Sequence, residues 1–358
     1  VEEAFTVTGR TDRNPDDLGL PAGVSTESRE GATAESEVVV APAATVDPET
    51  LARVPAAAEE GVIVPAARLP GYGALEVSLN STRLAHIDEA IRYLAEYPFD
   101  YLDHELTRVL PQIVFGETLT EFGSGSVAYR EGRVEQFFAD AVASQNDDGG
   151  FSYNARSYPR SSPYVSVKLA HYYALAREGG FAVDRTIDLP ALLRYLTAMQ
   201  SRETVSDYVK LYGLYASALH DVNVLPALDA FRERGDEIGL SGYAFLGLAY
   251  HELGERARAE EMRERIRRFI RIGTRGLDIT EPYESRFYFD SQVSQLALTQ
   301  LLYLELAPLD EMNDRLAHTL QIRQRGIVIL TDEIDESTLI VALGIIRAIR
   351  DQCIESLE

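Results

Sequence analysis

Most of the chain repeats one pattern, in which apolar residues lie three or four positions apart in segments divided by short polar junctions. From about residue 82 onward this spacing recurs in twelve segments, and it is the spacing that gives a helix one apolar face. Gly, Pro or Asp stands at most junctions, for example at Gly179, Asp188 and Pro308. The predicted helices are Thr82–Tyr97, Leu102–Gly116, Val127–Ser144, Tyr164–Gly179, Leu189–Gln200, Val205–His220, Pro226–Gly235, Leu240–Leu253, Arg256–Ile272, Asp290–Leu306, Asp310–Arg325 and Ile334–Ser356.

Short junctions of this kind are expected between helices that pack as antiparallel neighbours. Twelve helices paired as six hairpins predict a mainly α fold, an α/α toroid. An open solenoid is the rival architecture, but the sequence shows no strict repeat with a solenoid period.

Residues 1 to about 80 follow a different pattern, rich in Ala, Pro, Glu, Thr and Gly. Four short alternating or β-branched runs predict strands separated by turns. We therefore expect a β-strand segment over 1–80 and a helical domain over 81–358, with a flexible polar loop at Asp12–Ser36. The predicted strands are Ala4–Thr8, Glu37–Val40, Gly61–Val64 and Leu75–Leu79.

Charge and composition limit the classes of function. The 358 residues carry a formal net charge of −23, which argues against binding to nucleic acid or to an anionic membrane. Cys353 is the only cysteine, so an intrachain disulfide and a cysteine-rich metal site are both excluded. The chain begins Val-Glu-Glu, and we expect it to be a piece of a longer protein whose targeting signals it lacks.

The stretch from Tyr93 to Leu110 contains a helix, a tight turn and the start of a second helix. Pro98 disfavours helix in the residue before it, so the first helix is predicted to end near Tyr97. The turn and the second helix resemble the thioester region of the bacterial alpha-2-macroglobulin family. The resemblance includes the ending of the second helix, Thr107-Arg108-Val109-Leu110-Pro111. That family reads roughly Y-P-Y-G-C-x-E-Q here, and its cysteine, glutamate and glutamine fall on Tyr101, Asp103 and His104. The frame of the motif is kept in Tyr97, Pro98, Phe99 and Asp100.

Two later stretches support the resemblance. Residues 144–153, SQNDDGGFSY, are similar to the family's Q-x-x-D-G-G-F-x-x-W segment, with Tyr153 in place of the tryptophan. Residues 161–184 resemble a following helix of the family and its A-x-x-x-G-Y-x-V ending. The resemblance covers roughly residues 61 to 350.

The resemblance implies a thioester domain inserted into a β-sandwich of CUB type, in an envelope protein that is periplasmic or surface-anchored. Intact members are cleaved in a bait region by proteases, change shape and attach covalently through the thioester. This chain has neither the thiol nor the carboxamide at the matching positions. It is therefore expected to act without catalysis or cofactor, through non-covalent contacts with proteases and with neighbouring domains of the same longer chain.

Two clusters of polar residues could be interpreted as metal sites or, for the first of them, as an acid–base pair. Asp100, Asp103, His104 and Glu105 could ligate zinc or act as an acid–base pair. We favour an ordinary helix start with Asp100 as N-cap and acidic residues in the first turn. Residues 146–150, NDDGG, lack the ligand spacing of a calcium loop and are predicted to form a turn.

Histidines and tyrosines lie in several of the apolar helices. His171, His220 and His251 are expected to be buried and hydrogen-bonded. Tyr153, Tyr158, Tyr164, Tyr172 and Tyr173 could bind a partner or simply pack in the core. Two further functions stay open: a structural or adhesion module of an envelope protein, and a toroidal enzyme that acts on glycans with two carboxylates in its cavity.

Overall fold

The computed structural model describes residues 35–40, 58–63, 101–116, 130–154, 158–273, 276–280 and 290–326. The chain divides into two units, Val1–Ala85 and His86–Glu358. Several predictions lie outside the described residues: the helices Thr82–Tyr97 and Ile334–Ser356, the strands Ala4–Thr8 and Leu75–Leu79, the frame residues Tyr97, Pro98, Phe99 and Asp100, and the loop Asp12–Ser36 except for its last two residues, which belong to a strand.

In the first unit, two strands pair antiparallel. β1 (Glu35–Val40) and β2 (Ala58–Ile63) align Glu35 with Ile63 and Val40 with Ala58. They overlap the predicted strands Glu37–Val40 and Gly61–Val64, although β2 begins earlier. The assignment of this segment to a partial CUB-type domain remains a prediction.

In the second unit, the described residues are mainly helical, and most of the predicted helices are confirmed to within one or two residues. The helices are α3 (Leu102–Phe115), α5 (Arg133–Ala141), α6 (Pro163–Glu178), α7 (Leu189–Met199), α8 (Asp207–Ala218), α9 (Leu225–Glu233), α10 (Gly239–Glu252), α11 (Arg256–Arg267), α12 (Gln292–Leu306) and α13 (Met312–Gly326), with short 3-10 turns η3 (Val142–Ser144) and η4 (Gly235–Ile238).

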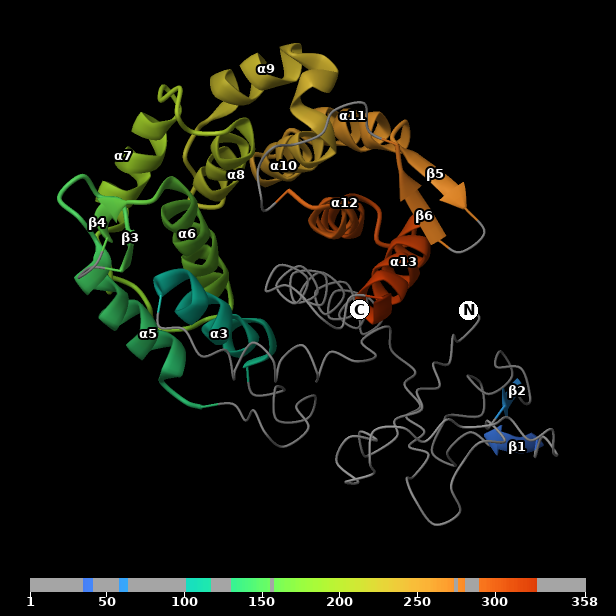
Figure 1. The fold of residues 1–358 in the computed structure, drawn as a ribbon. Helices are drawn as coiled ribbons and strands as arrows, with labels where there is room; N and C mark the ends of the chain where they lie inside the picture. Colours follow the sequence, from blue (N-terminus) through green and yellow to red (C-terminus); the bar gives the residue numbers. More distant parts are fainter. Residues whose placement is uncertain are drawn as a thin grey trace, which may run out of the picture. The chain divides into compact units, whose positions relative to one another are not determined.

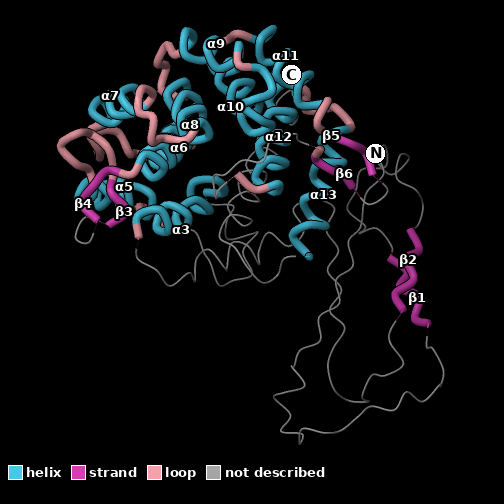
Figure 2. The backbone as a smooth tube through the Cα atoms, turned by 45° about the horizontal axis from the view of Figure 1, so that its top comes forward, coloured by secondary structure: helices cyan, strands magenta, loops and turns pink. Residues whose placement is uncertain are grey.

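The helices of the second unit form a curved array with an inner and an outer row (Figure 1). The inner helices α3, α6, α8, α10 and α12 contact one another in that order. The outer helices α5, α7, α9 and α11 each contact one or two inner helices next to them in sequence. Figure 2 shows the same succession of helices from a second direction.

The burial of each row follows from its sequence. The inner helix α10 is buried continuously from Gly239 to Tyr250, as expected for a helix enclosed by neighbours. Gly247 allows close packing there, because a Cβ at this position would lie 2.7 Å from the Leu302 side chain of α12. The outer helix α11 instead buries only Ala259, Met262 and Ile266, one narrow apolar stripe.

Serine and aspartate caps define several of the helix starts. Ser162, Asp188, Ser206 and Ser291 each accept a hydrogen bond from the backbone N–H three residues later, at the starts of α6, α7, α8 and α12. Pro163 follows the first of these caps at a position where its missing N–H costs nothing.

Two predicted boundaries are wrong, and two hairpins went unpredicted. Helix α5 begins at Arg133, after a turn at Arg130–Gly132, and not at Val127. Helix α11 ends at Arg267, before the predicted Ile272, because β5 (Ile270–Gly273) pairs antiparallel with β6 (Gly276–Ile279). A second hairpin joins β3 (Ser152–Asn154) to β4 (Tyr158–Ser161). Strands this short are stabilised by their partner strand, which a helical spacing of apolar residues does not reveal.

Candidate functional site

The start of α3 brings together Tyr101, Asp103 and His104, the three residues that the sequence aligns with the family's cysteine, glutamate and glutamine. His104 Nε2 lies 3.8 Å from Asp103 Oδ2, and the rings of Tyr101 and His104 meet edge to face with centroids 5.7 Å apart. Tyr101 is 37% exposed, whereas Asp103 and His104 are half-buried. The structure therefore places a phenol, a carboxylate and an imidazole side by side at one helix start.

The helix begins differently from the expectation. Its N-cap is Tyr101, not Asp100, and the Tyr101 side chain makes no capping hydrogen bond. The acidic residues Asp103 and Glu105 do lie in the first turn, where the partial positive charge of the helix end favours them. The sequence predicts Asp100 as the cap because Asp is the stronger capping residue by type; the structure places the cap at Tyr101, whose backbone is extended.

Glu105, in the same turn, pairs with two arginines. Its carboxylate binds Arg108 on the same helix, and Arg133 Nη2 of α5 lies 3.2 Å from Glu105 Oε2. Glu105 thus joins α3 to α5 as an ion-pair partner. The structure thus brings Asp103 and His104 together and pairs Glu105 with arginines, while Asp100 lies outside the described residues.

Lys168 of α6 supports the first turn of α3 from the interior. Its side chain is only 4% exposed, and Nζ donates to Thr107 Oγ1 at 2.8 Å and to the Asp103 carbonyl oxygen at 3.4 Å. The Thr107 hydroxyl also donates to the Asp103 carbonyl, at 2.9 Å. A buried ammonium needs such acceptors, so Lys168 fixes where the helix starts. No role was predicted for this residue, although a lysine inside the apolar run Val165–Ala170 was a visible signal.

Tyr153 lies close to the same group from strand β3. Burial raises the pKa of Tyr153, the hydrogen bond with Ser162 lowers it, and the charge of Asp103 raises it, so the net change is upward. Strand β3 contacts both α3 and α6. Tyr153 therefore lies close to Asp103 at the start of α3.

The turn before β3 is confirmed as a structural turn. Asp148 Oδ1 accepts from the Gly150 N–H at 3.1 Å and from the Ser161 hydroxyl at 2.5 Å. Gly149 has φ +87°, and a Cβ there would lie 2.2 Å from the Ala191 carbonyl oxygen. Gln145 holds the other side, with both amide atoms bound to the backbone of Asp188 at 2.9 and 3.0 Å. These contacts join the end of α5, the start of α6 and the start of α7.

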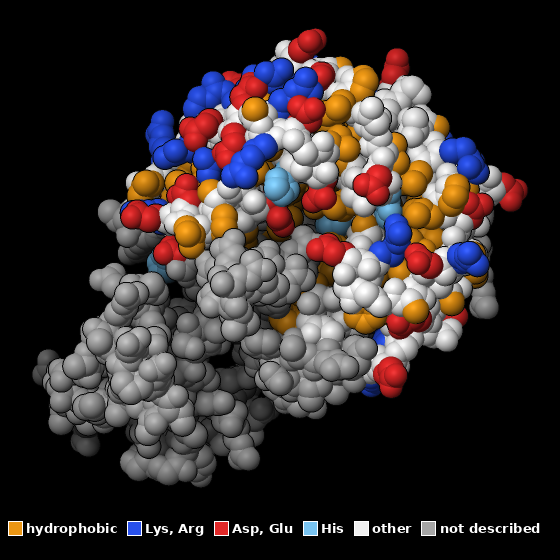
Figure 3. All heavy atoms as spheres, turned by 180° about the vertical axis from the view of Figure 1, so that it is seen from behind, with side chains coloured by type: hydrophobic (Ala, Val, Ile, Leu, Met, Phe, Trp, Pro, Cys, Tyr) orange, Lys and Arg blue, Asp and Glu red, His pale blue; other side chains and the backbone are white. Residues whose placement is uncertain are grey.

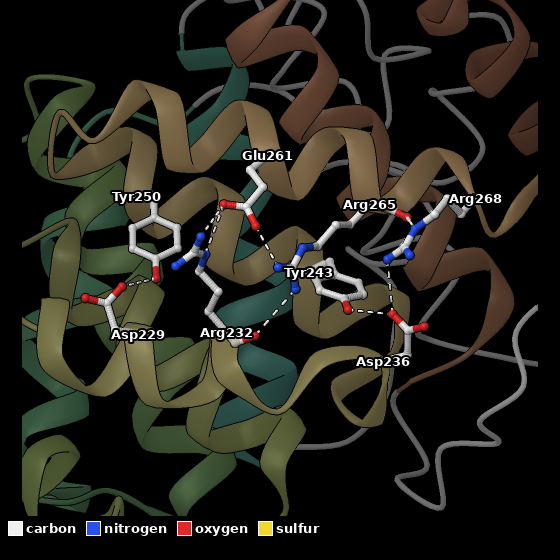
Figure 4. Close-up of polar contacts among 8 residues, drawn as sticks. All are labelled: Asp229, Arg232, Asp236, Tyr243, Tyr250, Glu261, Arg265 and Arg268. Atoms are coloured by element: carbon white, nitrogen blue, oxygen red, sulfur yellow. Dashed lines mark hydrogen bonds and ion pairs between the residues drawn. The ribbon is translucent and has the colours of Figure 1, made fainter.

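A second polar cluster links the outer helices α9 and α11 to the inner helix α10 (Figure 4). Glu261 lies at its centre: Oε2 accepts from Arg232 at 2.6 and 3.0 Å, and Oε1 accepts from Arg265 at 2.6 Å. Burial raises the pKa of Glu261, but its bonds and charges with Arg232 and Arg265 together lower it further, so the net change is downward. This carboxylate is held ionised between two guanidinium groups.

Two tyrosines of α10 extend the cluster (Figure 4). The Tyr250 hydroxyl donates to Asp229 at 2.8 Å, and the Tyr243 hydroxyl donates to Asp236 at 2.7 Å. Burial and these carboxylates raise the pKa of both hydroxyls. In the space-filling view of Figure 3, arginine and acidic side chains alternate over this region, so the surface is one of paired charges and not a basic patch. We assign the cluster to holding the helix rows together.

Comparison with known proteins gives matches among solved structures. No family model and no curated protein sequence matches the chain. Native alpha-2-macroglobulin from Escherichia coli, from domain MG7 to the C-terminus, matches with TM-score 0.60 and 19% identity over 72% of this chain and 42% of the other. Salmonella alpha-2-macroglobulin reacted with methylamine matches with TM-score 0.60 and 16% identity, over 91% of this chain and 22% of the other.

The chain shares its fold with bacterial alpha-2-macroglobulins. Escherichia coli alpha-2-macroglobulin activated by porcine elastase matches as well, with TM-score 0.53 and 17% identity over 71% of this chain and 24% of that one. The chain thus spans less than half the length of each of these alpha-2-macroglobulin structures. The resemblance found in the sequence is confirmed, and at these identities what the proteins share is the fold.

Within this alpha-2-macroglobulin fold, His171 is buried and His220 is partly buried, and both are hydrogen-bonded as expected. His171 Nδ1 lies 2.8 Å from the Tyr212 hydroxyl, and His220 Nε2 lies 2.9 Å from the Ala170 carbonyl oxygen. His251 differs, because its side chain is 33% exposed and lies 3.7 Å from Glu305 of α12. Tyr172 and Tyr173 are fully buried, so core packing accounts for both.

Metal ligation and membrane insertion find no support in the described residues. No three His, Cys, Asp or Glu side chains there are arranged to hold a metal ion. No helix in the same part of the chain has the length and apolar character needed to cross a bilayer.

Proposed function

We propose that this chain is a non-enzymatic module of a bacterial alpha-2-macroglobulin-like envelope protein, and that it takes part in protease trapping without covalent capture. The observation that carries the proposal is the group Tyr101, Asp103 and His104 at the start of α3, in a chain with the fold of alpha-2-macroglobulins. A thioester needs a thiol and a carboxamide, and these three side chains supply neither.

The contacts around the start of α3 support the proposal that the structure of this region is kept although the reactive residues are absent. Lys168 and Thr107 still fix the first turn of α3, and Tyr153 still packs beside it. The half-exposed Tyr101 ring leaves an aromatic surface at the position where the family carries its reactive cysteine. Aromatic side chains of this kind contribute strongly to protein contacts, so we assign this end of α3 to non-covalent docking with proteases or with neighbouring domains of the longer chain.

The wider architecture is part of the same proposal. We infer that the curved array closes into an α/α toroid of about six hairpins, that the segment before it belongs to a CUB-type domain, and that the parent protein is periplasmic or surface-anchored. Each of these expectations rests on the resemblance to bacterial alpha-2-macroglobulins. The alternating inner and outer helices support the first of them.

The direct test uses the longer parent protein. It is incubated with a panel of proteases, with and without methylamine, and intact masses are measured under native and denaturing conditions. A complex seen only under native conditions and unaffected by methylamine supports the proposal. A complex that survives denaturation, or no complex and no cleavage with any protease, contradicts it; the second result favours a structural or adhesion module.

A second experiment tests the assignment of positions. The substitutions Tyr101→Cys, Asp103→Glu and His104→Gln are combined in a Cys353→Ser background, so that the new thiol is the only one. If the positions match those of the family, the variant loses one ammonia as the thioester forms and then gains methylamine. The control keeps Tyr101 and carries the other three substitutions, and it should do neither. Unchanged mass in a folded variant would contradict the assignment.

A further inference from the structure

The β5–β6 hairpin has two edges, and the register shows which backbone groups face each of them. Ile270 is opposite Ile279, Arg271 opposite Asp278 and Ile272 opposite Leu277. The Thr280 N–H donates to the Phe269 carbonyl at 2.7 Å, so the next pair outward is hydrogen-bonded. Bonded and non-bonded pairs alternate in an antiparallel ladder. The N–H and C=O groups of Ile270 and Ile272 therefore point away from β6.

The outer edge of β6 is covered by α13. The N–H of Leu277 donates to Thr319 Oγ1 of α13 at 2.9 Å, and the Leu277 side chain is only 2% exposed. This bond also confirms the alternation, because it requires the Leu277 N–H to point away from β5. The hairpin is thus hydrogen-bonded to α13 through β6, while Ile270 of β5 packs against the apolar cluster of α12 and α13.

Among the described residues, no helix or strand is hydrogen-bonded to the outer edge of β5. In the part of the chain that the structure describes, no hydrogen bond satisfies the outward groups of Ile270 and Ile272. The Ile272 side chain is 62% exposed, although it lies on the same face of the hairpin as the buried Leu277 opposite it. The apolar face that packs on α12 and α13 therefore ends at β5, with an exposed isoleucine next to a row of unused backbone groups.

Arg271 is the charged side chain of β5 at this edge. It is exposed, it lies opposite Asp278 of β6, and no ion pair of Arg271 is found within the described residues. If β5 of a second copy paired antiparallel through Ile270 and Ile272, the two Arg271 side chains would be directly opposite each other, and like charges at that position repel. A short edge with a cation also resists self-association. An incoming strand with a carboxylate beside Arg271 and an apolar side chain beside Ile272 would not be repelled by the charge of Arg271.

We propose that the free edge of β5 binds an extended, acidic segment of a partner protein as a third strand, separately from the α3 site and from the function proposed above. The backbone groups of Ile270 and Ile272 supply the hydrogen bonds, which do not depend on the partner's sequence. Ile272 and Arg271 supply the preference for alternating apolar and acidic side chains. This is strand addition to an exposed sheet edge.

The test measures binding of two labelled peptides to the full chain by fluorescence anisotropy. One peptide repeats Val-Glu, and the other repeats Val-Lys. We expect the acidic peptide to bind at least about tenfold more tightly than the basic one. Equal affinity, preference for the basic peptide or no binding of the acidic peptide at millimolar concentration would overturn the proposal.

Two variants locate the site. Ile272→Pro removes an N–H that the hairpin does not use, which proline permits on an edge strand, and it should weaken acidic-peptide binding by roughly tenfold or more. Arg271→Gln should reduce the discrimination between the two peptides. The matched control Arg256→Gln removes an exposed arginine from the start of α11 and should change neither result.

Two control measurements test whether a variant has unfolded and whether the chain associates with itself. Circular dichroism establishes that each variant retains the helical content of the parent chain. Sedimentation at rising protein concentration then tests the rival occupant: a chain that dimerises, and whose dimer is lost in Ile272→Pro, would show that the edge binds a second copy and would overturn the proposal. Arg271→Gln tests the charge preference without removing any backbone group.

Discussion

At the scale of single residues, buried polar groups distinguish this protein most clearly from a generic helical domain. Lys168 and His220 both lie inside apolar helices or against them, and each is bound to a backbone carbonyl. Such groups are stable only where a partner replaces water. Both residues should therefore control stability more than their polar character suggests.

Lys168 gives the first prediction. Lys168→Met keeps the length of the side chain but removes the bonds to Thr107 and Asp103, and we expect it to lower the free energy of unfolding by about 2 kcal/mol. The measurement is urea unfolding followed by circular dichroism. Lys210→Met, at the only other lysine, is the control and should cost less than about 0.5 kcal/mol. Equal effects of the two substitutions would contradict the assigned role of Lys168.

His220 gives a prediction about pH. Burial lowers the pKa of His220 from 6.5, the bond to Ala170 raises it, and the charge of Arg177 lowers it again, with a net downward change. The unfolded chain therefore binds the proton more readily, and stability is lost as pH falls below 6.5 toward the folded pKa. Unfolding measured between about pH 7.5 and about pH 5 should show this slope reduced in His220→Gln. An unchanged slope in the variant would assign it to other groups.

At the scale of elements, the turn Asn146–Gly150 shows why certain residues recur between helices. The turn is closed by Asp148 and Ser161, and it places Gly149 against the backbone of α7. Its acidic composition serves local hydrogen bonding. The same argument applies to Glu261, whose charge is used between α9 and α11.

Gly149→Ala gives a prediction at this scale. The left-handed φ and the contact with the Ala191 carbonyl should together lower the free energy of unfolding by about 3 kcal/mol. Gly180→Ala is the matched control, since Gly180 has φ +81° but a methyl group added there would meet nothing within 4 Å, and it should cost about 1 kcal/mol. Thermal and urea unfolding of the two variants measure the difference. If Gly180→Ala lowered the free energy of unfolding as much as Gly149→Ala, the close contact between position 149 and α7 would not contribute to the effect.

At the scale of the whole helical unit, the two rows of helices should differ in local stability. The inner helix α10 is buried on all sides, whereas the outer helix α11 buries one stripe and otherwise carries paired charges. Hydrogen exchange follows the free energy of local opening. We expect amides of α8, α10 and α12 to exchange more slowly than those of α9 and α11 when followed by mass spectrometry. An α11 as protected as α10 would contradict this division.

The sequence by itself determined the helices of this unit and the family resemblance. Apolar spacing and capping residues are local, so they place α6, α8 and α12 to within one or two residues. The turn at 146–150 follows from residue type in the same way. These features depend on neighbours in sequence, and local interactions are sufficient to encode them.

Only the tertiary structure decided which of these residues meet. It paired Glu105 with Arg133, placed Lys168 under the first turn of α3, put the helix cap at Tyr101, and ended α11 early in favour of β5. The contacts of Glu105 and Lys168 depend on partners from distant parts of the chain. Burial, ion pairing and strand pairing are set by such partners, and a reading of local spacing contains no information about them.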